Sequence, residues 1–143
     1  IPVSIKFLGF KNTMAIGILA MFLRYVMSAL SPEVGGLYFG AIAVHGAIFG
    51  FFFVAAQMYI DKKAPADIKA QAQGLYFFFY GVAQVIGTFF SKWLIDSYTA
   101  LPAQAGAEAV TNWATVFWIE SAISGALLIF FYLFFKNDVK EQQ

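Results

Sequence analysis

The sequence contains no cysteine and only one histidine, and charged residues make up just 12% of its 143 residues. Without cysteine there is no disulfide or thiolate ligand, and a lone histidine makes no metal site, so we expect neither metal nor cofactor. Motifs of soluble enzymes are absent, as are the paired carboxylates or Ser–His pair of an intramembrane hydrolase. A net charge of +1 gives no reason to expect a nucleic-acid partner. These absences argue against an enzyme.

What the sequence has in excess is apolar surface, with 61% hydrophobic and 20% aromatic residues and a mean hydropathy of +0.73. So short a chain cannot bury that much apolar surface in one core, and a soluble domain has about 25% charged residues. Four apolar segments, at residues 13–30, 35–60, 68–95 and 113–135, each approach or exceed the roughly 20 residues that a helix needs to cross a bilayer. The sequence therefore predicts an all-α membrane protein with four transmembrane helices and a tail at residues 136–143.

The lysines predict the orientation of these spans. With four crossings both chain ends lie on one side of the membrane, and every lysine except Lys92 falls on that side. The positive-inside rule makes this side, and with it the C-terminal tail, cytoplasmic. Trp93, Tyr98 and Trp113 gather at the opposite boundary, as expected of an aromatic belt. The first residues, IPVSIKFLGFKN, look like the end of an earlier span without an initiator methionine, which predicts that the chain is a piece of a longer protein.

Three titratable side chains, Arg24, His45 and Glu120, fall inside the predicted spans, where such groups are costly and indicate function by default. Arg24 and Glu120 both lie roughly 10 Å below the outer boundary, at 1.5 Å of rise per residue. We expect them to form a structural ion pair that holds two helices together. The alternatives are a role in transport coupling, snorkelling of the side chains to the boundary, and contact with parts of the protein outside this chain.

His45 lies on one side of the second predicted span, together with Tyr38, Phe49 and Phe52. The opposite side carries a stripe of small residues that permits close approach of another helix: Gly36, Gly40, Ala43, Ala47 and Gly50. The aromatic side either touches lipid, with His45 bonded to a neighbour, or lines a cavity. In a cavity the rings would stack on flat ligands such as nucleobases, and His45 could carry a proton.

Residues 45–75, HGAIFGFFFVAAQMYIDKKAPADIKAQAQGL, resemble helices ten and eleven of the nucleoside:proton symporter family, within the major facilitator superfamily. IPVSIKFLGFKNTM and the LRY at residues 23–25 resemble the loop between helices eight and nine and the ninth helix of that family. The likeness covers nearly the whole chain. It implies that the chain is a fragment of a twelve-helix fold and supplies helices nine to twelve. The expected partners are then the upstream helices of the same protein and the lipid bilayer.

The resemblance also implies a function, namely nucleoside:proton symport across the cytoplasmic (inner) membrane by alternating access. In the family, positions matching His45 and Phe49 contribute to the nucleoside site, and Phe52 and Tyr38 are weaker candidates. Some relatives carry an aspartate where this chain has Gly50. His45 is therefore the proton-coupling candidate on this helix. The alternatives are a major facilitator transporter for another small solute, such as a sugar, and a small membrane subunit that serves assembly without transport.

Overall fold

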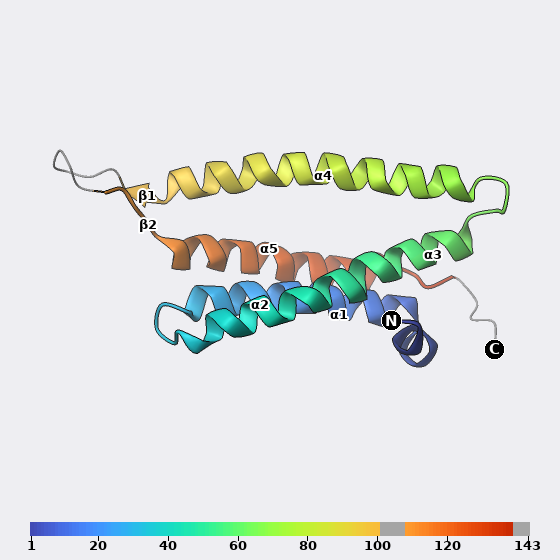
Figure 1. Ribbon diagram of the computed structural model, residues 1–143, viewed down its shortest axis with the longest axis horizontal. Coiled ribbons are helices and arrows are strands. Elements are labelled where there is room, and N and C mark those ends of the chain that lie inside the picture. Colours follow the sequence, from blue (N-terminus) through green and yellow to red (C-terminus); the bar gives the residue numbers. More distant parts are fainter. Residues whose placement is uncertain (101–107, 139–143) are drawn as a thin grey trace.

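Four long helices run back and forth in the computed structural model, which describes residues 1–100 and 108–138 (Figure 1). The helical elements are α1 (Pro2–Leu30), α2 (Gly36–Ile48), the π-helix η1 (Phe49–Val54), α3 (Ala55–Lys63), α4 (Lys69–Ser97) and α5 (Trp113–Phe134). Because α2, η1 and α3 continue one another, they make one helix over Gly36–Lys63. Each of the four long helices is apolar enough to cross a membrane. The predicted all-α fold with four such helices is confirmed.

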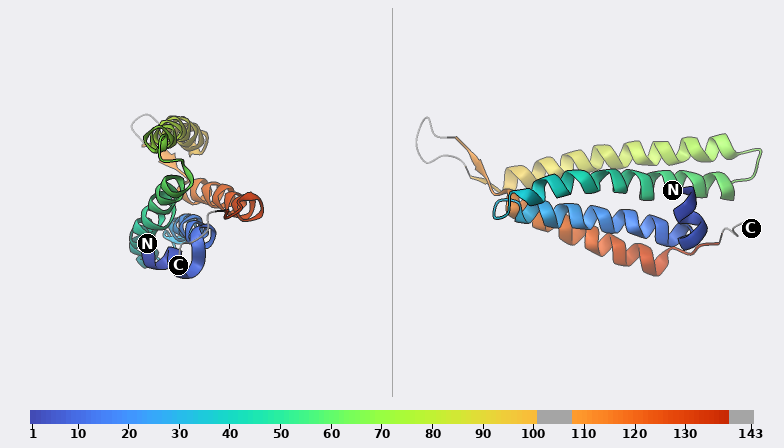
Figure 2. Two further views of the ribbon diagram at one scale, coloured as in Figure 1. Left: turned by 90° about the vertical axis from the view of Figure 1, so that its right-hand side faces the viewer. Right: turned by 60° about the horizontal axis from the view of Figure 1, so that its bottom comes forward.

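The first helix begins upstream of the predicted span. It starts at Pro2 rather than near residue 13 and is broken at Gly9, where φ is 74° and ψ is 169°. Glycine adopts this positive φ without steric cost because it has no Cβ. The residues before Gly9 therefore form a short helical segment that turns away from the rest of α1 (Figure 2). Ile5 and Phe10 hold this end of α1 against Ala55 in a buried apolar cluster.

A short ribbon closes the end of the bundle where α4 stops and α5 begins (Figure 1). Strands β1 (Thr99–Ala100) and β2 (Val110–Thr111) pair antiparallel, with Thr99 opposite Thr111. The two threonine hydroxyls lie 2.8 Å apart, within hydrogen-bonding distance. The backbone N–H of Thr115 donates to Asn112 Oδ1 at 3.1 Å, which caps the N-terminus of α5. The ribbon and the cap fix where α5 starts.

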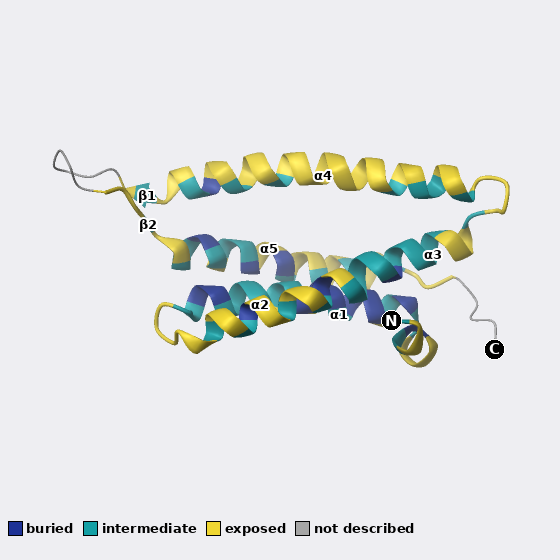
Figure 3. Ribbon diagram, in the orientation of Figure 1, coloured by how far each residue is buried: buried dark blue, intermediate teal, exposed yellow. Residues whose placement is uncertain are grey.

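Helix α1 packs against both α5 and the α2–η1–α3 helix, and it carries most of the buried residues (Figures 1 and 3). Its crossing with η1 is very close. A Cβ atom on Gly17 would lie 2.6 Å from the backbone nitrogen of Phe52 and 2.7 Å from the Cβ of Phe52. Phe52 also packs edge to face on Phe131 of α5, with 6.4 Å between ring centroids. Gly17 is thus the point at which three helices meet.

Helix α4 lies to one side of the other three and is exposed along almost its whole length (Figure 3). It touches α3 through two polar contacts: Gln73 Nε2 donates to the carbonyl oxygen of Gln57 at 2.9 Å, and Lys69 Nζ lies 3.3 Å from an Asp61 carboxylate oxygen. Its exposed large apolar residues include Leu75, Phe77, Phe78, Phe79, Val85, Ile86 and Phe89. Such a surface needs lipid or further protein around it.

The lysine-rich end of the bundle also holds the first residues of α1 and the residues that follow α5 as far as Asp138 (Figure 1). There Lys63 Nζ lies 2.7 Å from Asp138 Oδ2, and the Tyr59 hydroxyl donates to the same carboxylate. The hydrogen bond from Lys63, followed by that from Tyr59, lowers the pKa of the Asp138 carboxyl. These contacts tie the residues after α5 to α3. Of the predicted tail at residues 136–143, positions 139–143 lie outside the described residues.

Candidate functional site

Three of the predicted site residues share one open face of the second long helix. Tyr38, His45 and Phe49 follow one another at spacings of seven and four residues, which places them on the same side of a helix. All three are exposed, Tyr38 at 55% and Phe49 at 61%. The structure therefore brings a titratable ring together with two aromatic rings on a surface that no other described helix covers.

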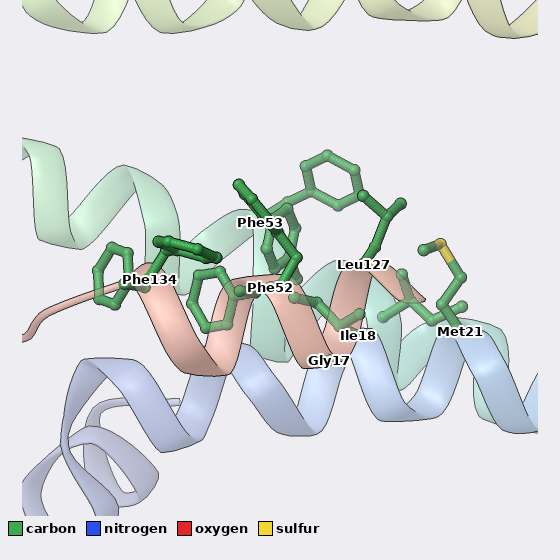
Figure 4. A pocket seen from close by; sticks show the side chains of 11 residues that line it. Gly17, Ile18, Met21, Phe52, Phe53, Leu127 and Phe134 are labelled. Atoms are coloured by element: carbon green, nitrogen blue, oxygen red, sulfur yellow. The ribbon is translucent and has the colours of Figure 1, made fainter. Parts of the chain in front are cut away.

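Phe52 does not share this face. It lies in an apolar pocket of about 490 Å³ between α1, η1 and α5, with Gly17, Ile18 and Phe131 among the lining residues (Figure 4). An ideal α-helix would have placed Phe52 beside His45. The π-helix spaces its hydrogen bonds five residues apart rather than four, so each residue turns through a smaller angle. Phe52 consequently stays on the α1 side of the helix.

A line of aromatic rings leads from the open face of α2 to α4. The rings of Phe49 and Phe53 have centroids 6.0 Å apart, and Phe53 meets Tyr80 of α4 edge to face at 5.1 Å. The Tyr80 hydroxyl accepts a hydrogen bond of 2.8 Å from Gln84 Nε2. We call Phe49, Phe53, Tyr80 and Gln84 the aromatic track. Its α4 end borders a pocket of about 440 Å³, lined by Phe52, Phe53, Tyr76, Phe79, Tyr80, Ala83 and Gln84.

Phe53 and Tyr80 are site residues that the sequence alone does not predict. A helical wheel describes a single helix, whereas the contact between these two rings depends on how α4 lies against η1. The available signal was the density of aromatic residues in both segments, at 51–53 and 76–80. That signal predicts aromatic packing in general and does not say which rings meet.

His45 has a polar partner in the same part of the bundle. Arg24 of α1 places one guanidinium nitrogen 3.1 Å from His45 Nδ1. Glu120 of α5 is half-buried and close enough to Arg24 for their charges to interact. The ion pairs within 4.0 Å in the described residues are Lys63–Asp138, Lys69–Asp61 and Lys92–Asp96, so the expected Arg24–Glu120 pair is not formed at that distance. Arg24 is directed to the histidine instead.

Comparison with known proteins places these features in a family. The model of the family described as Nucleoside H+ symporter matches residues 1–140. Nucleoside permease NupG of Escherichia coli (strain K12) is 29% identical over 140 residues, which cover 95% of this chain and 32% of the permease. The xanthosine permease of the same organism is 26% identical over 142 residues, covering 96% of this chain and 32% of the permease. The chain thus spans about a third of the length of these curated relatives.

A solved structure shows the same arrangement of helices. The crystal structure of nucleoside transporter NupG, as its D323A mutant, superposes with a TM-score of 0.82 at 30% sequence identity, over 95% of this chain and 33% of that one. The relatives are permeases and transporters by name, not enzymes. With four helices apolar enough to span a bilayer, the chain is a multi-pass membrane protein. It belongs to the nucleoside H+ symporter family.

Proposed function

We propose that this chain forms part of a nucleoside:proton symporter of the cytoplasmic (inner) membrane, in which it supplies helices nine to twelve of a twelve-helix major facilitator fold. The observation that carries the proposal is the open face of the second long helix, formed by Tyr38, His45 and Phe49, and its continuation along the aromatic track to α4. The family match and the names of the relatives support a nucleoside as the substrate.

The chemistry of this surface suits a nucleoside. A nucleobase offers two flat faces for stacking and a polar edge for hydrogen bonds, and stacking on an aromatic side chain contributes about 1–3 kcal/mol per base. Phe49 provides an exposed ring, while His45 and Gln84 provide hydrogen-bonding groups at either end of the aromatic track. We propose His45 and Phe49 as the main substrate contacts, with Tyr38 as a weaker one. Phe52 would act by positioning η1 rather than by touching substrate.

The packing suggests which helices move together during alternating access and which face the rest of the transporter. Helices α1 and α5 form a closely packed pair that also holds η1 at Gly17. This pair would move as one body, with the open face of α2 and the exposed surface of α4 turned toward the remaining helices of the transporter. The lysine-rich end, where α1 begins and α5 ends, would face the cytoplasm.

The proton is proposed to act through His45. Among the described residues of the second long helix, Gly36–Lys63, His45 is the side chain away from the charged end that can take up and release a proton. Gly50 stands where some relatives have an acid, so this helix offers no carboxylate within its apolar part. A proton moving inward down its gradient would drive nucleoside uptake.

An uptake assay on the complete protein tests this function. Cells that express it are expected to accumulate radiolabelled nucleoside, and an uncoupler that dissipates the proton gradient should reduce the accumulation to the level of cells with an empty vector. The matched control is uptake by a sodium-driven carrier in the same cells over the same short exposure to the uncoupler. Persistent accumulation after uncoupling would contradict proton coupling, and uptake of a sugar in place of nucleosides would identify another major facilitator transporter.

A further inference from the structure

The contact between Arg24 and His45 restricts where the histidine can carry its proton. One guanidinium nitrogen of Arg24 lies 3.1 Å from His45 Nδ1, and the two residues come from different helices. A guanidinium group has five N–H donors and no acceptor, and it stays charged at all accessible pH values. Arg24 must therefore donate, and Nδ1 of His45 must accept. The imidazole in this contact is neutral and carries its hydrogen on Nε2.

Arg24 contacts the neutral His45 although a carboxylate, that of Glu120, lies nearby. A charged side chain within a membrane span is costly unless it is paired, and a carboxylate is a stronger partner for a guanidinium than a neutral imidazole. Glu120 of α5 lies near enough for its charge to act on Arg24, yet the two do not come within 4.0 Å. Tyr25 of α1 interacts with both charges, and α4 contributes the neutral Ser91 beside Glu120.

We propose that Arg24 is a positioning residue that holds His45 in its Nε2–H form, so that His45 meets the substrate as a hydrogen-bond donor. This inference rests on the proposed transport site and specifies its chemistry. The group of the nucleoside that contacts His45 is then an acceptor, either a carbonyl oxygen or ring nitrogen of the base or a hydroxyl oxygen of the ribose. A substrate group that only donates finds no partner at His45.

The same contact sets a condition for proton coupling through His45. A proton that binds Nδ1 forms an N–H bond there and removes the lone pair that accepts from Arg24. The imidazolium and the guanidinium then repel each other, so the contact breaks when His45 becomes charged. Glu120 is the carboxylate available to receive the released guanidinium. Arg24 thus donates to His45 while the ring is neutral and turns to Glu120 when the ring is protonated.

The ¹⁵N NMR spectrum of the imidazole tests the inference directly. In histidine-labelled complete protein in lipid nanodiscs, the signals of His45 are assigned by their loss in His45→Gln, since the rest of the protein can contribute further histidines. At neutral pH the wild type is expected to show Nδ1 unprotonated and Nε2 protonated, favoured about tenfold or more over the other tautomer, as a hydrogen bond to a charged group implies. Hydrogen on Nδ1 in the wild-type spectrum would overturn the proposal without any variant.

Variants of Arg24 separate a positioning role from a merely structural one. In Arg24→Leu the tautomer preference should fall at least severalfold, because the donor to Nδ1 is gone. Arg24→Lys, which keeps a charged donor, should restore much of the preference. An unchanged tautomer ratio in a folded Arg24→Leu protein would contradict the proposal. Because these spectra need no substrate, they test Arg24 separately from the nucleoside assignment, which depends on uptake.

Discussion

Replacing His45 with alanine in the complete protein is expected to reduce nucleoside uptake about tenfold or more while the protein still reaches the membrane. The substitution removes the polar group of the open α2 face and leaves Arg24 without its hydrogen-bond acceptor. Loss of a hydrogen bond in a dehydrated site costs about 1–3 kcal/mol, and 1.4 kcal/mol corresponds to a factor of ten. Initial rates of radiolabelled uptake, normalised to the amount of protein in the membrane, measure the effect.

Phe39→Ala is the matched control for this substitution. Phe39 belongs to the same helix and is 74% exposed, but it points to a different side from His45, six residues further along. Its truncation removes a large exposed ring and should leave uptake close to that of the wild type. Wild-type uptake by His45→Ala at normal abundance would remove His45 from the substrate path, and an equal loss in both variants would point to a general effect on the helix.

Replacing Gly17 with alanine is expected to destabilise the protein, whereas the same change at Gly46 should not. Glycine to alanine inside a helix ordinarily stabilises by about 1 kcal/mol. At Gly17 the new methyl group would lie 2.6 Å from the backbone nitrogen of Phe52. A backbone atom cannot move aside, whereas the end of a flexible side chain can. Forcing α1 and η1 apart costs about 1–3 kcal/mol and exceeds that gain. A Cβ on Gly46 meets nothing within 4 Å.

Thermal unfolding of the purified protein in detergent measures the difference between the two glycine variants. The midpoint should fall for Gly17→Ala and stay level or rise for Gly46→Ala. A larger residue at position 17, such as valine, should lower the midpoint further or prevent accumulation of the protein. Equal midpoints for the two alanine variants would show that the close crossing of α1 with η1 does not hold this part of the bundle together.

The sequence alone predicts the four long helices because each appears as a long apolar segment. An uninterrupted apolar run of about 20 residues has few folded alternatives to a membrane span. The start of α1 is less predictable, since Gly9 permits both a loop and a broken helix, and the structure has the broken helix. The placement of Tyr38, His45 and Phe49 on one face follows from ordinary helical spacing and needs no tertiary information.

The parts of the site that escaped prediction depend on tertiary structure or on irregular backbone. Phe52 was assigned to the His45 face on the assumption of an ideal α-helix, and the π-helix at Phe49–Val54 turns it toward α5 instead. Arg24 was expected to pair with Glu120 because opposite charges at similar depth suggest an ion pair. Its contact with His45 depends on how α1 crosses α2, which neither segment encodes by itself.

Protection of a single cysteine tests most directly whether the open face of Tyr38, His45 and Phe49 borders the path of the nucleoside. This sequence has no cysteine, so any cysteines of the complete protein that need to be replaced lie outside it. Phe49→Cys is then introduced into the cysteine-free protein, and Leu133→Cys on α5 serves as an exposed control. Saturating nucleoside should slow maleimide labelling at position 49 severalfold and leave labelling at position 133 unchanged. Equal labelling rates at position 49 with and without nucleoside, in a protein that still transports, would contradict the account.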